Sequence, residues 1–149
     1  MIPKKIFQTY SSFDELHPDM KANSKKISEM HPDWEYTFFS EPDVLSFISE
    51  QFGKRFLEYY QKIDSDYGGT RADFFRYLVI FKYGGVYLDI KSGLTKHLKK
   101  IILDGDSFLC SHWPKRYSGW GQYRDLNGKP EFQNWFIISE PNHPFLALR

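Results

Sequence analysis

Short apolar runs alternate with longer amphipathic segments along this chain. The apolar runs are rich in β-branched and aromatic residues, which favour strands. The best marked of them follows directly after two glycines. We predict strands at residues 4–10, 34–39, 86–90, 108–110 and 135–139.

Apolar residues at helical spacing mark the longer segments between these strands. Residues 40–63 follow such a pattern, with Gly53 as an interruption. A second helix is predicted to begin at Thr70 and to end at Gly84, since glycine is a common helix terminator. Because strands and helices alternate in this order, we predict an α/β fold with a mostly parallel central sheet.

Three other segments are less regular. Residues 11–26 are polar and predict a loop with one amphipathic helix that Pro18 keeps short. Residues 114–129 are polar and glycine-rich, and a loop of this length is often functional. A further helix is expected to begin after Pro144.

Length and charge narrow the classes of function. The chain has 149 residues, which is enough for one hydrophobic core and predicts a single domain over residues 1–149. Lysine and arginine number 20 against 19 acidic residues, so the net charge is +1. Because no overall field attracts nucleic acid or an anionic membrane, we expect no nucleic-acid partner.

The cysteine content and the N-terminal segment bear on the cellular compartment. Cys110 is the only cysteine, so the chain can form neither an intrachain disulfide nor a thiolate metal cluster. The first ten residues, MIPKKIFQTY, lack the apolar core and cleavage site of a signal peptide. No apolar run approaches the roughly 20 residues that a membrane span needs. We therefore expect a cytoplasmic protein without a membrane span.

Candidate chemistry begins at the strand predicted over residues 86–90. Side chains alternate along a strand, so Asp89 and Lys91 should share one face, roughly 6–7 Å apart. The simplest interpretation is a weak ion pair on a partly exposed face. However, Asp89 ends a strand of an α/β sheet, and the carboxyl edge is where such folds bind ligands.

A second polar pair lies on the helix that precedes this strand. Asp73 and Arg76 are three residues apart and should be neighbours on the helix surface. Asp73 falls in the first turn, where the helix dipole favours an acid. Because the helix leads directly into the strand, both residues could converge with Asp89 and Lys91 in one cleft.

The segment from Arg71 to Lys91, RADFFRYLVIFKYGGVYLDIK, resembles the DXD-containing sugar-binding region of glycosyltransferase family 32. Three other segments, IPKKIFQTY, HPDWEYTFF and NWFIISEPNHPFL, resemble further strands of that family in the same order. The resemblance covers essentially the whole chain. It implies a GT-A type, Rossmann-like fold that binds a nucleotide sugar.

The resemblance also implies a reaction and its site residues. The reaction would be a retaining transfer of a hexose from a UDP- or GDP-sugar to a hydroxyl of a glycan or glycoconjugate acceptor. Asp73, Arg76 and Asp89 would be catalytic, with the first two holding sugar hydroxyls and phosphate, and Asp89 near the ribose and a metal ion. The substrate-binding residues would be Gln8, Thr9, Tyr10, Lys91 and Asn134, with Tyr10 stacking on the base.

The chain departs from the family pattern at two of these positions. Phe7 replaces a histidine, a change that we expect to alter packing more than chemistry. Lys91 replaces the second acid of the DXD motif, and an ammonium group has no lone pair for a metal. We therefore expect the Mn²⁺ or Mg²⁺ site of the family to be weakened or absent here, and Lys91 could bind the diphosphate directly. Asp89 would be the one remaining metal ligand.

Alternatives remain open at this level. The family's catalytic domain continues past the segment at which this chain ends, so we expect either a C-terminally truncated domain or a compact variant. A catalytically silent module that binds a sugar nucleotide or a glycan is the main alternative function. A haloacid-dehalogenase-like phosphatase is a weaker one, because YLDIKSG lacks the second acid which that chemistry also needs.

Overall fold

A computed structural model describes residues 1–112 and 132–147 of the protein. In this part of the chain, five strands form one sheet in the order β2-β1-β3-β5-β4. The strands are β1 (Lys5–Thr9), β2 (Glu35–Phe39), β3 (Gly85–Leu88), β4 (Phe108–His112) and β5 (Phe132–Ser139).

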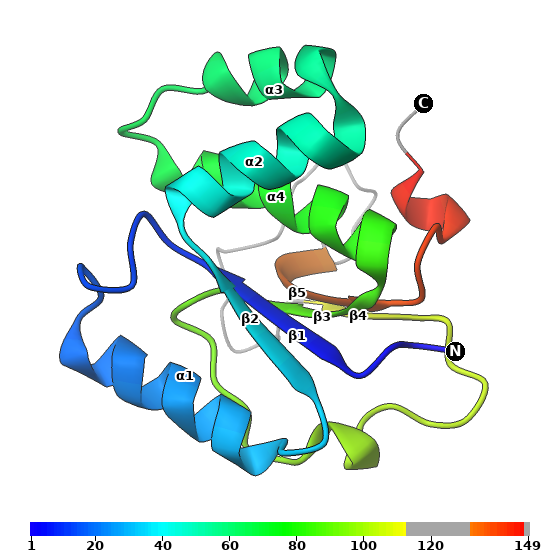
Figure 1. The fold of residues 1–149 in the computed structure, drawn as a ribbon. Coiled ribbons are helices and arrows are strands. Elements are labelled where there is room, and N and C mark those ends of the chain that lie inside the picture. Colours follow the sequence, from blue (N-terminus) through cyan, green and yellow to red (C-terminus); the bar gives the residue numbers. More distant parts are fainter. Residues whose placement is uncertain (113–131, 148–149) are drawn as a thin grey trace.

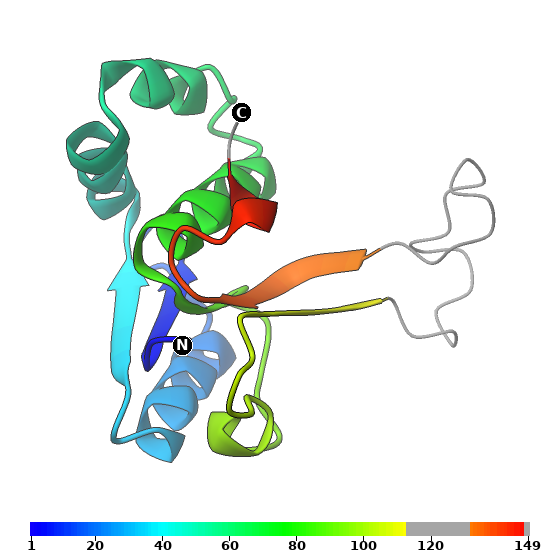
Figure 2. The same cartoon turned by 90° about the vertical axis from the view of Figure 1, so that its right-hand side faces the viewer.

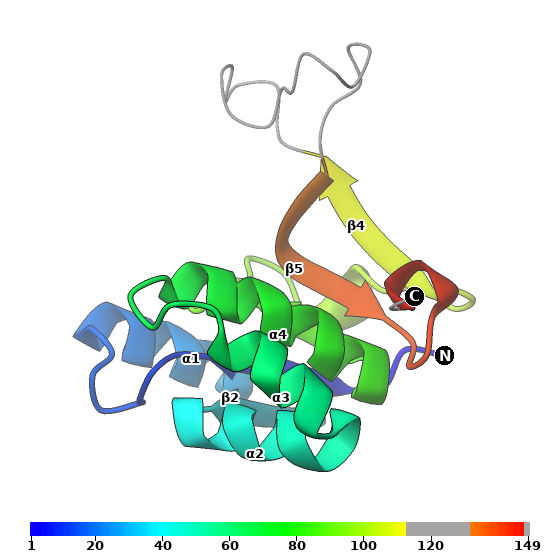
Figure 3. The ribbon, with the colours of Figure 1, turned by 90° about the horizontal axis from the view of Figure 1, so that it is seen from above.

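The sheet is mixed. β1 pairs in parallel with both β2 and β3, whereas β5 runs antiparallel to β3 and β4 runs antiparallel to β5. The ends of β4 and β5 project beyond the helical layers (Figures 2 and 3). The predicted α/β class is confirmed, and the parallel part of the sheet comprises β2, β1 and β3.

Helices cover both faces of the sheet (Figure 1). α1 lies on one face, and α2, α3 and α4 lie on the other. No helix in the described ranges has the length and apolar character needed to cross a membrane. The helices are α1 (Pro18–Met30), α2 (Glu41–Phe52), α3 (Lys54–Gln61) and α4 (Gly68–Tyr83), with 3-10 turns η1 (Leu98–Lys100) and η3 (Pro144–Leu146).

Two hydrophobic cores result from the alternation of side chains along the strands. Phe7 and Tyr87 pack with α2 and α4 on one face, while Ile6 and Val86 pack with α1 on the other. Phe7 is buried, and its ring centroid lies 6.1 Å from that of Tyr83. The residue in place of the family's histidine is thus part of the core, as expected.

Several element boundaries differ from the sequence-based expectation. Pro18 is the first residue of α1 and does not shorten it. The N–H groups of a helix's first turn have no acceptor within the helix, so a proline there loses no helical hydrogen bond. The helix expected after Pro144 is a single 3-10 turn. β3 ends at Leu88, so Asp89 and Lys91 lie on the turn after the strand and not on a shared strand face. The loop predicted at 114–129 lies outside the described residues.

Candidate active site

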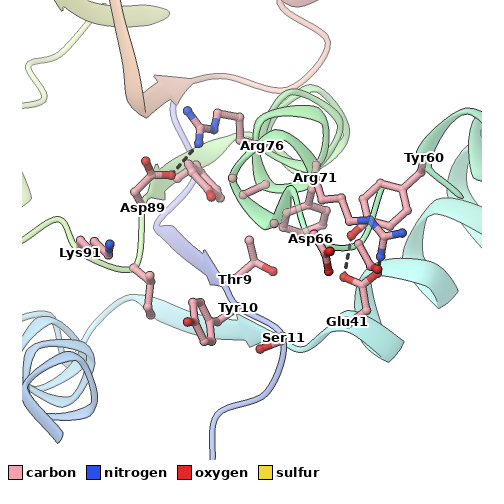
Figure 4. A pocket seen from close by; sticks show the side chains of 17 residues that line it. Thr9, Tyr10, Ser11, Glu41, Tyr60, Asp66, Arg71, Arg76, Asp89 and Lys91 are labelled. Carbon is pink, nitrogen blue, oxygen red and sulfur yellow. Dashed lines mark hydrogen bonds and ion pairs between the residues drawn. The ribbon is translucent and has the colours of Figure 1, made fainter. Parts of the chain in front are cut away.

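A cavity of about 650 Å³ lies at the carboxyl ends of β1 and β3, next to the first turns of α4. Figure 4 shows Asp89 and Lys91 on one side of it, and Glu41 and Arg71 on the other. This is the edge at which α/β sheets bind ligands. The lining residues are Thr9, Tyr10, Ser11, Glu41, Tyr60, Ser65, Asp66, Gly68, Gly69, Arg71, Ala72, Phe75, Arg76, Tyr87, Asp89, Ile90 and Lys91.

Arg76 is the centre of a charged cluster on the β3 side of the cavity. Its guanidinium Nη2 lies 2.7 Å from Asp89 Oδ1 and 2.8 Å from Asp73 Oδ1. Its Nη1 donates to the backbone carbonyl of Asn134 on β5 at 2.6 Å. Only 3% of the Arg76 side chain is exposed, and its guanidinium lies over the ring of Tyr87, 5.1 Å from the ring centroid. Asp73, Arg76 and Asp89 therefore meet, although Asp73 is not among the residues that line the cavity. Lys91, the fourth residue of the predicted convergence, lines the cavity but forms no ion pair with these three.

The environment of Asp89 raises the pKa of its carboxyl group. Burial is the main cause, and the nearby Asp73 carboxylate adds to it, while the Arg76 guanidinium acts in the opposite direction. Because the folded-state pKa lies above the unfolded one, ionised Asp89 opposes folding, and protonation on acidification relieves this cost. A carboxylate kept here despite that cost is typical of a functional site.

Gln8 supports the turn that carries Asp89. Its side chain is fully buried and is not among the residues that line the cavity. The amide Nε2 donates to the backbone carbonyl of Asp89 at 3.2 Å, and Oε1 accepts from Ser24 Oγ at 2.9 Å and from the Tyr36 hydroxyl at 2.7 Å. The structure thus places Gln8 behind the site, where it fixes the backbone of Asp89.

The other predicted substrate-binding residues differ in their positions. Thr9 and Tyr10 line the cavity at the end of β1, and 40% of Tyr10 is exposed. Thr9 Oγ1 donates to the carbonyl of Phe39 at 2.8 Å, which ties the end of β1 to β2. Asn134 does not line the cavity and reaches the cluster only through its backbone carbonyl. Lys91 is exposed and lines the cavity.

A second polar cluster, which the sequence did not indicate, forms the opposite wall. Arg71 Nη1 lies 2.6 Å from Glu41 Oε1, and the Tyr60 hydroxyl donates to Glu41 Oε2 at 2.7 Å. Arg71 also donates twice to the carbonyl of Ile63. Burial and the Glu41 carboxylate raise the pKa of Tyr60, so its phenol keeps the proton that it donates. Glu41 in the first turn of α2 was the one signal in the sequence. It did not point to a site, because the helix dipole by itself accounts for an acid at a helix start.

The side chains of the site do not match a divalent cation. No group of three His, Cys, Asp or Glu residues is arranged to hold a metal in residues 1–112 and 132–147. Asp89 Oδ1 is engaged by Arg76, and the residue two positions later offers an ammonium group where a hard cation needs oxygen. In the described part of the chain, the side chains of this site are therefore better suited to bind an anion than a cation.

The fold and the site together define an α/β protein with a cavity, lined by charged and aromatic side chains, at the carboxyl edge of its parallel strands. The family described as "Glycosyltransferase sugar-binding region containing DXD motif" matches residues 9–108. The chain belongs to this family. The motif segment reads Asp89-Ile90-Lys91 here, with lysine in place of the second acid.

Individual relatives agree with this assignment. Mannosyl phosphorylinositol ceramide synthase SUR1 of Saccharomyces cerevisiae is 30% identical over 145 residues, which cover 97% of this chain and 33% of the relative. Inositol phosphoceramide mannosyltransferase 2 of Schizosaccharomyces pombe is 28% identical, over 99% of this chain and 37% of the relative. The chain thus spans about a third of the length of these relatives.

A solved structure shows the same fold. The PaToxG glycosyltransferase aligns with a TM-score of 0.69 over 97% of this chain and 57% of its own, at 15% sequence identity. The shared architecture confirms the predicted glycosyltransferase-type α/β fold.

Proposed function

We propose that this chain binds a nucleoside diphosphate hexose and transfers the hexose, with retention of configuration, to a hydroxyl of a glycan or glycoconjugate. The observation that carries the proposal is the pair of Arg76 and Asp89 in the cavity lining, with Asp73 bound to Arg76 just outside that lining, in a chain of the DXD sugar-binding family. The cavity volume of about 650 Å³ lies within the range of small-molecule sites.

The residues of the cavity suit the parts of such a donor. The exposed ring of Tyr10 offers a stacking surface for a base. Asp89 accepts hydrogen bonds from ribose hydroxyls, and Asp73 accepts them from the sugar. Arg76 is a permanent cation that donates to sugar or phosphate oxygens.

The same residues fit the requirements of the transfer. The bond between the anomeric carbon and the diphosphate oxygen breaks, and its electron pair leaves with the diphosphate. The acceptor oxygen bonds to the anomeric carbon on the face that the diphosphate leaves, which retains the configuration, and its proton passes to the departing diphosphate oxygen. Positive charge develops on the sugar and negative charge on the leaving group, so fixed carboxylates and cations around the donor lower the barrier.

The names of the relatives guide the choice of donor. The two yeast relatives are named for the transfer of mannose to inositol-containing ceramides. A mannose donor is therefore the first candidate for this chain, and a glycolipid is a reasonable first acceptor class. UDP-glucose and UDP-galactose serve as comparison donors.

The test is transfer of radiolabelled hexose from GDP-mannose and from the UDP-sugars, with the wild type and an Asp89→Asn variant. We expect turnover of one donor, and a loss of at least about a hundredfold in Asp89→Asn, since a charged hydrogen-bond acceptor is worth about 1.5–3 kcal/mol and also orients the donor. Asp104→Asn, at an exposed loop position outside the cavity, is the matched control. Donor binding without turnover would instead favour the silent sugar-nucleotide module, and no binding of any donor would refute the proposal.

A further inference from the structure

We propose that Lys91 supplies the positive charge for the donor's diphosphate, so that this chain binds its nucleotide sugar without a divalent cation. The inference rests on the proposed function and concerns how the same cavity holds the phosphates. It starts from the lysine that occupies the position of the second acid in a family described by its DXD motif.

The backbone around Lys91 is held in place on both sides. Ser92 N donates to the carbonyl of Asp89 at 2.7 Å, which closes the turn. That same carbonyl accepts from the buried Gln8, and the carbonyl of Ser92 accepts from Asn23 Nδ2 on α1 at 2.7 Å. The turn therefore presents Lys91 from a fixed position at the wall of the cavity, as Figure 4 shows.

The ammonium group of Lys91 is available for a ligand. The side chain is exposed, and it has no ion pair with any residue in the described ranges. The adjacent carboxylate of Asp89 is engaged by Arg76 at 2.7 Å. Lys4 and Lys99, by contrast, both pair with Asp33 within 3.0 Å. A cation without an ion pair, in a cavity wall whose acid Asp89 is already paired with Arg76, is suited to bind an anion.

The charge of the cavity lining points to the same conclusion. The charged residues that line the cavity balance, with three acids and three cations: Glu41, Asp66 and Asp89 against Arg71, Arg76 and Lys91. An acid at position 91 would leave four carboxylates against two guanidinium groups, an excess of two negative charges that a divalent cation would neutralise. With lysine there, a bound divalent cation would face an ammonium group at the same site, which raises the cost of binding it.

The chemistry of lysine fits this role. Lysine binds phosphate as a compact point charge and needs no fixed fork geometry. Its ammonium group provides three donors for the diphosphate oxygens. The residue that prevents metal ligation thus provides the phosphate charge that the metal would supply.

Isothermal titration calorimetry with GDP-mannose and UDP-glucose, each in EDTA and in Mn²⁺, tests the inference. We expect the wild type to bind one of these donors with an affinity that changes less than about threefold between EDTA and Mn²⁺. Lys91→Asp should bind that donor at least about tenfold more weakly in EDTA, since a charged hydrogen bond is worth about 1.5–3 kcal/mol, and should recover with Mn²⁺. Lys96→Asp makes the same charge change at an exposed position outside the cavity and should behave as the wild type.

The outcomes separate this inference from the proposed function. Wild-type binding that requires Mn²⁺ would overturn the inference and leave the proposed function intact. A Lys91→Asp variant that binds as the wild type does in EDTA would also overturn it. No binding of either donor under either condition would overturn both proposals. Because Lys91 is exposed, its variants are expected to keep the thermal unfolding midpoint of the wild type, which the same samples report.

Discussion

Arg76 is the residue on which the geometry of the site depends. Its guanidinium joins α4, the turn after β3, and β5 through Asp73, Asp89 and the carbonyl of Asn134. The pairing with Asp73 could be predicted, because residues three apart on a helix are neighbours. The contact with the Asn134 carbonyl could not, because that group belongs to the backbone and carries no signature in the sequence.

The pKa of Asp89 should respond in opposite directions to two substitutions. Arg76→Gln removes the charge that lowers this pKa, so we expect it to rise further. Asp73→Asn removes a charge that raises it, so we expect it to fall. Carbon-13 NMR titration of the Asp89 carboxyl group measures both shifts. No shift in either variant would show that burial alone sets the pKa, and a shift in the same direction for both would contradict the opposing charge effects.

Gln8 illustrates what the sequence could and could not indicate at this scale. Its place at the end of a predicted strand associated it with the site, and the resemblance implied contact with the substrate. In the structure, the strand's alternation turns Gln8 toward α1, and its side-chain carbonyl oxygen accepts hydrogen bonds from Ser24 on α1 and from Tyr36 on β2. The residue is therefore connected to the site through the backbone of Asp89. Only the packing of α1 reveals this role.

At the scale of elements, the junction between α4 and β3 positions the site. Gly84 ends α4 and Gly85 begins β3, with φ of 62° and 100° respectively. A Cβ atom at Gly85 would lie 2.6 Å from the carbonyl oxygen of Lys5 on β1. Gly85 thus lets β3 approach β1 closely, and this approach brings Asp89 next to the end of β1. A Cβ atom at Gly84 would instead collide with Pro141 and Pro3.

Substitution of Gly85 by alanine should be strongly destabilising. We expect a loss of about 2–5 kcal/mol in the free energy of unfolding, from the positive φ together with the clash with Lys5. Gly69→Ala, at a helical position where a Cβ atom meets nothing within 4 Å, should be neutral or slightly stabilising. Urea denaturation measures both. An equal effect of the two substitutions would contradict the close approach of β1 and β3.

The predicted elements were largely correct in type, and the differences have physical causes. Apolar runs identified each of the five strands in residues 1–112 and 132–147, because the β-branched and aromatic residues that fill the core also favour strands. The direction of β5 could not be predicted, since an apolar run does not encode orientation. β3 ends earlier than expected because the carbonyl of Asp89 accepts from the side chain of Gln8 and from the backbone of Ser92 in the turn, although the Asp89 N–H still donates to Trp135 on β5.

At the scale of the whole molecule, one wall of the cavity could be predicted from the sequence and the other could not. The charged residues of α4 and of the turn with Asp89 lie on one continuous segment of the sequence, which is why the sequence indicated that wall. The wall with Glu41, Tyr60 and Arg71 is assembled from α2, α3 and α4, and its contacts depend on how these helices pack. Local patterns do not encode such packing, which explains why this cluster was missed.

The central claim is that the cavity at the carboxyl edge of β1 and β3 binds the nucleotide-sugar donor. The most direct test is NMR titration of the isotopically labelled protein with GDP-mannose, followed by mapping of the backbone amide shifts. We predict saturable shifts that are largest at Thr9, Tyr10, Asp89 and Lys91 and that are lost in Asp89→Asn. Shifts concentrated on the outer surface of α1 or on β4, or no saturable shifts with GDP-mannose or with UDP-hexoses, would contradict the claim.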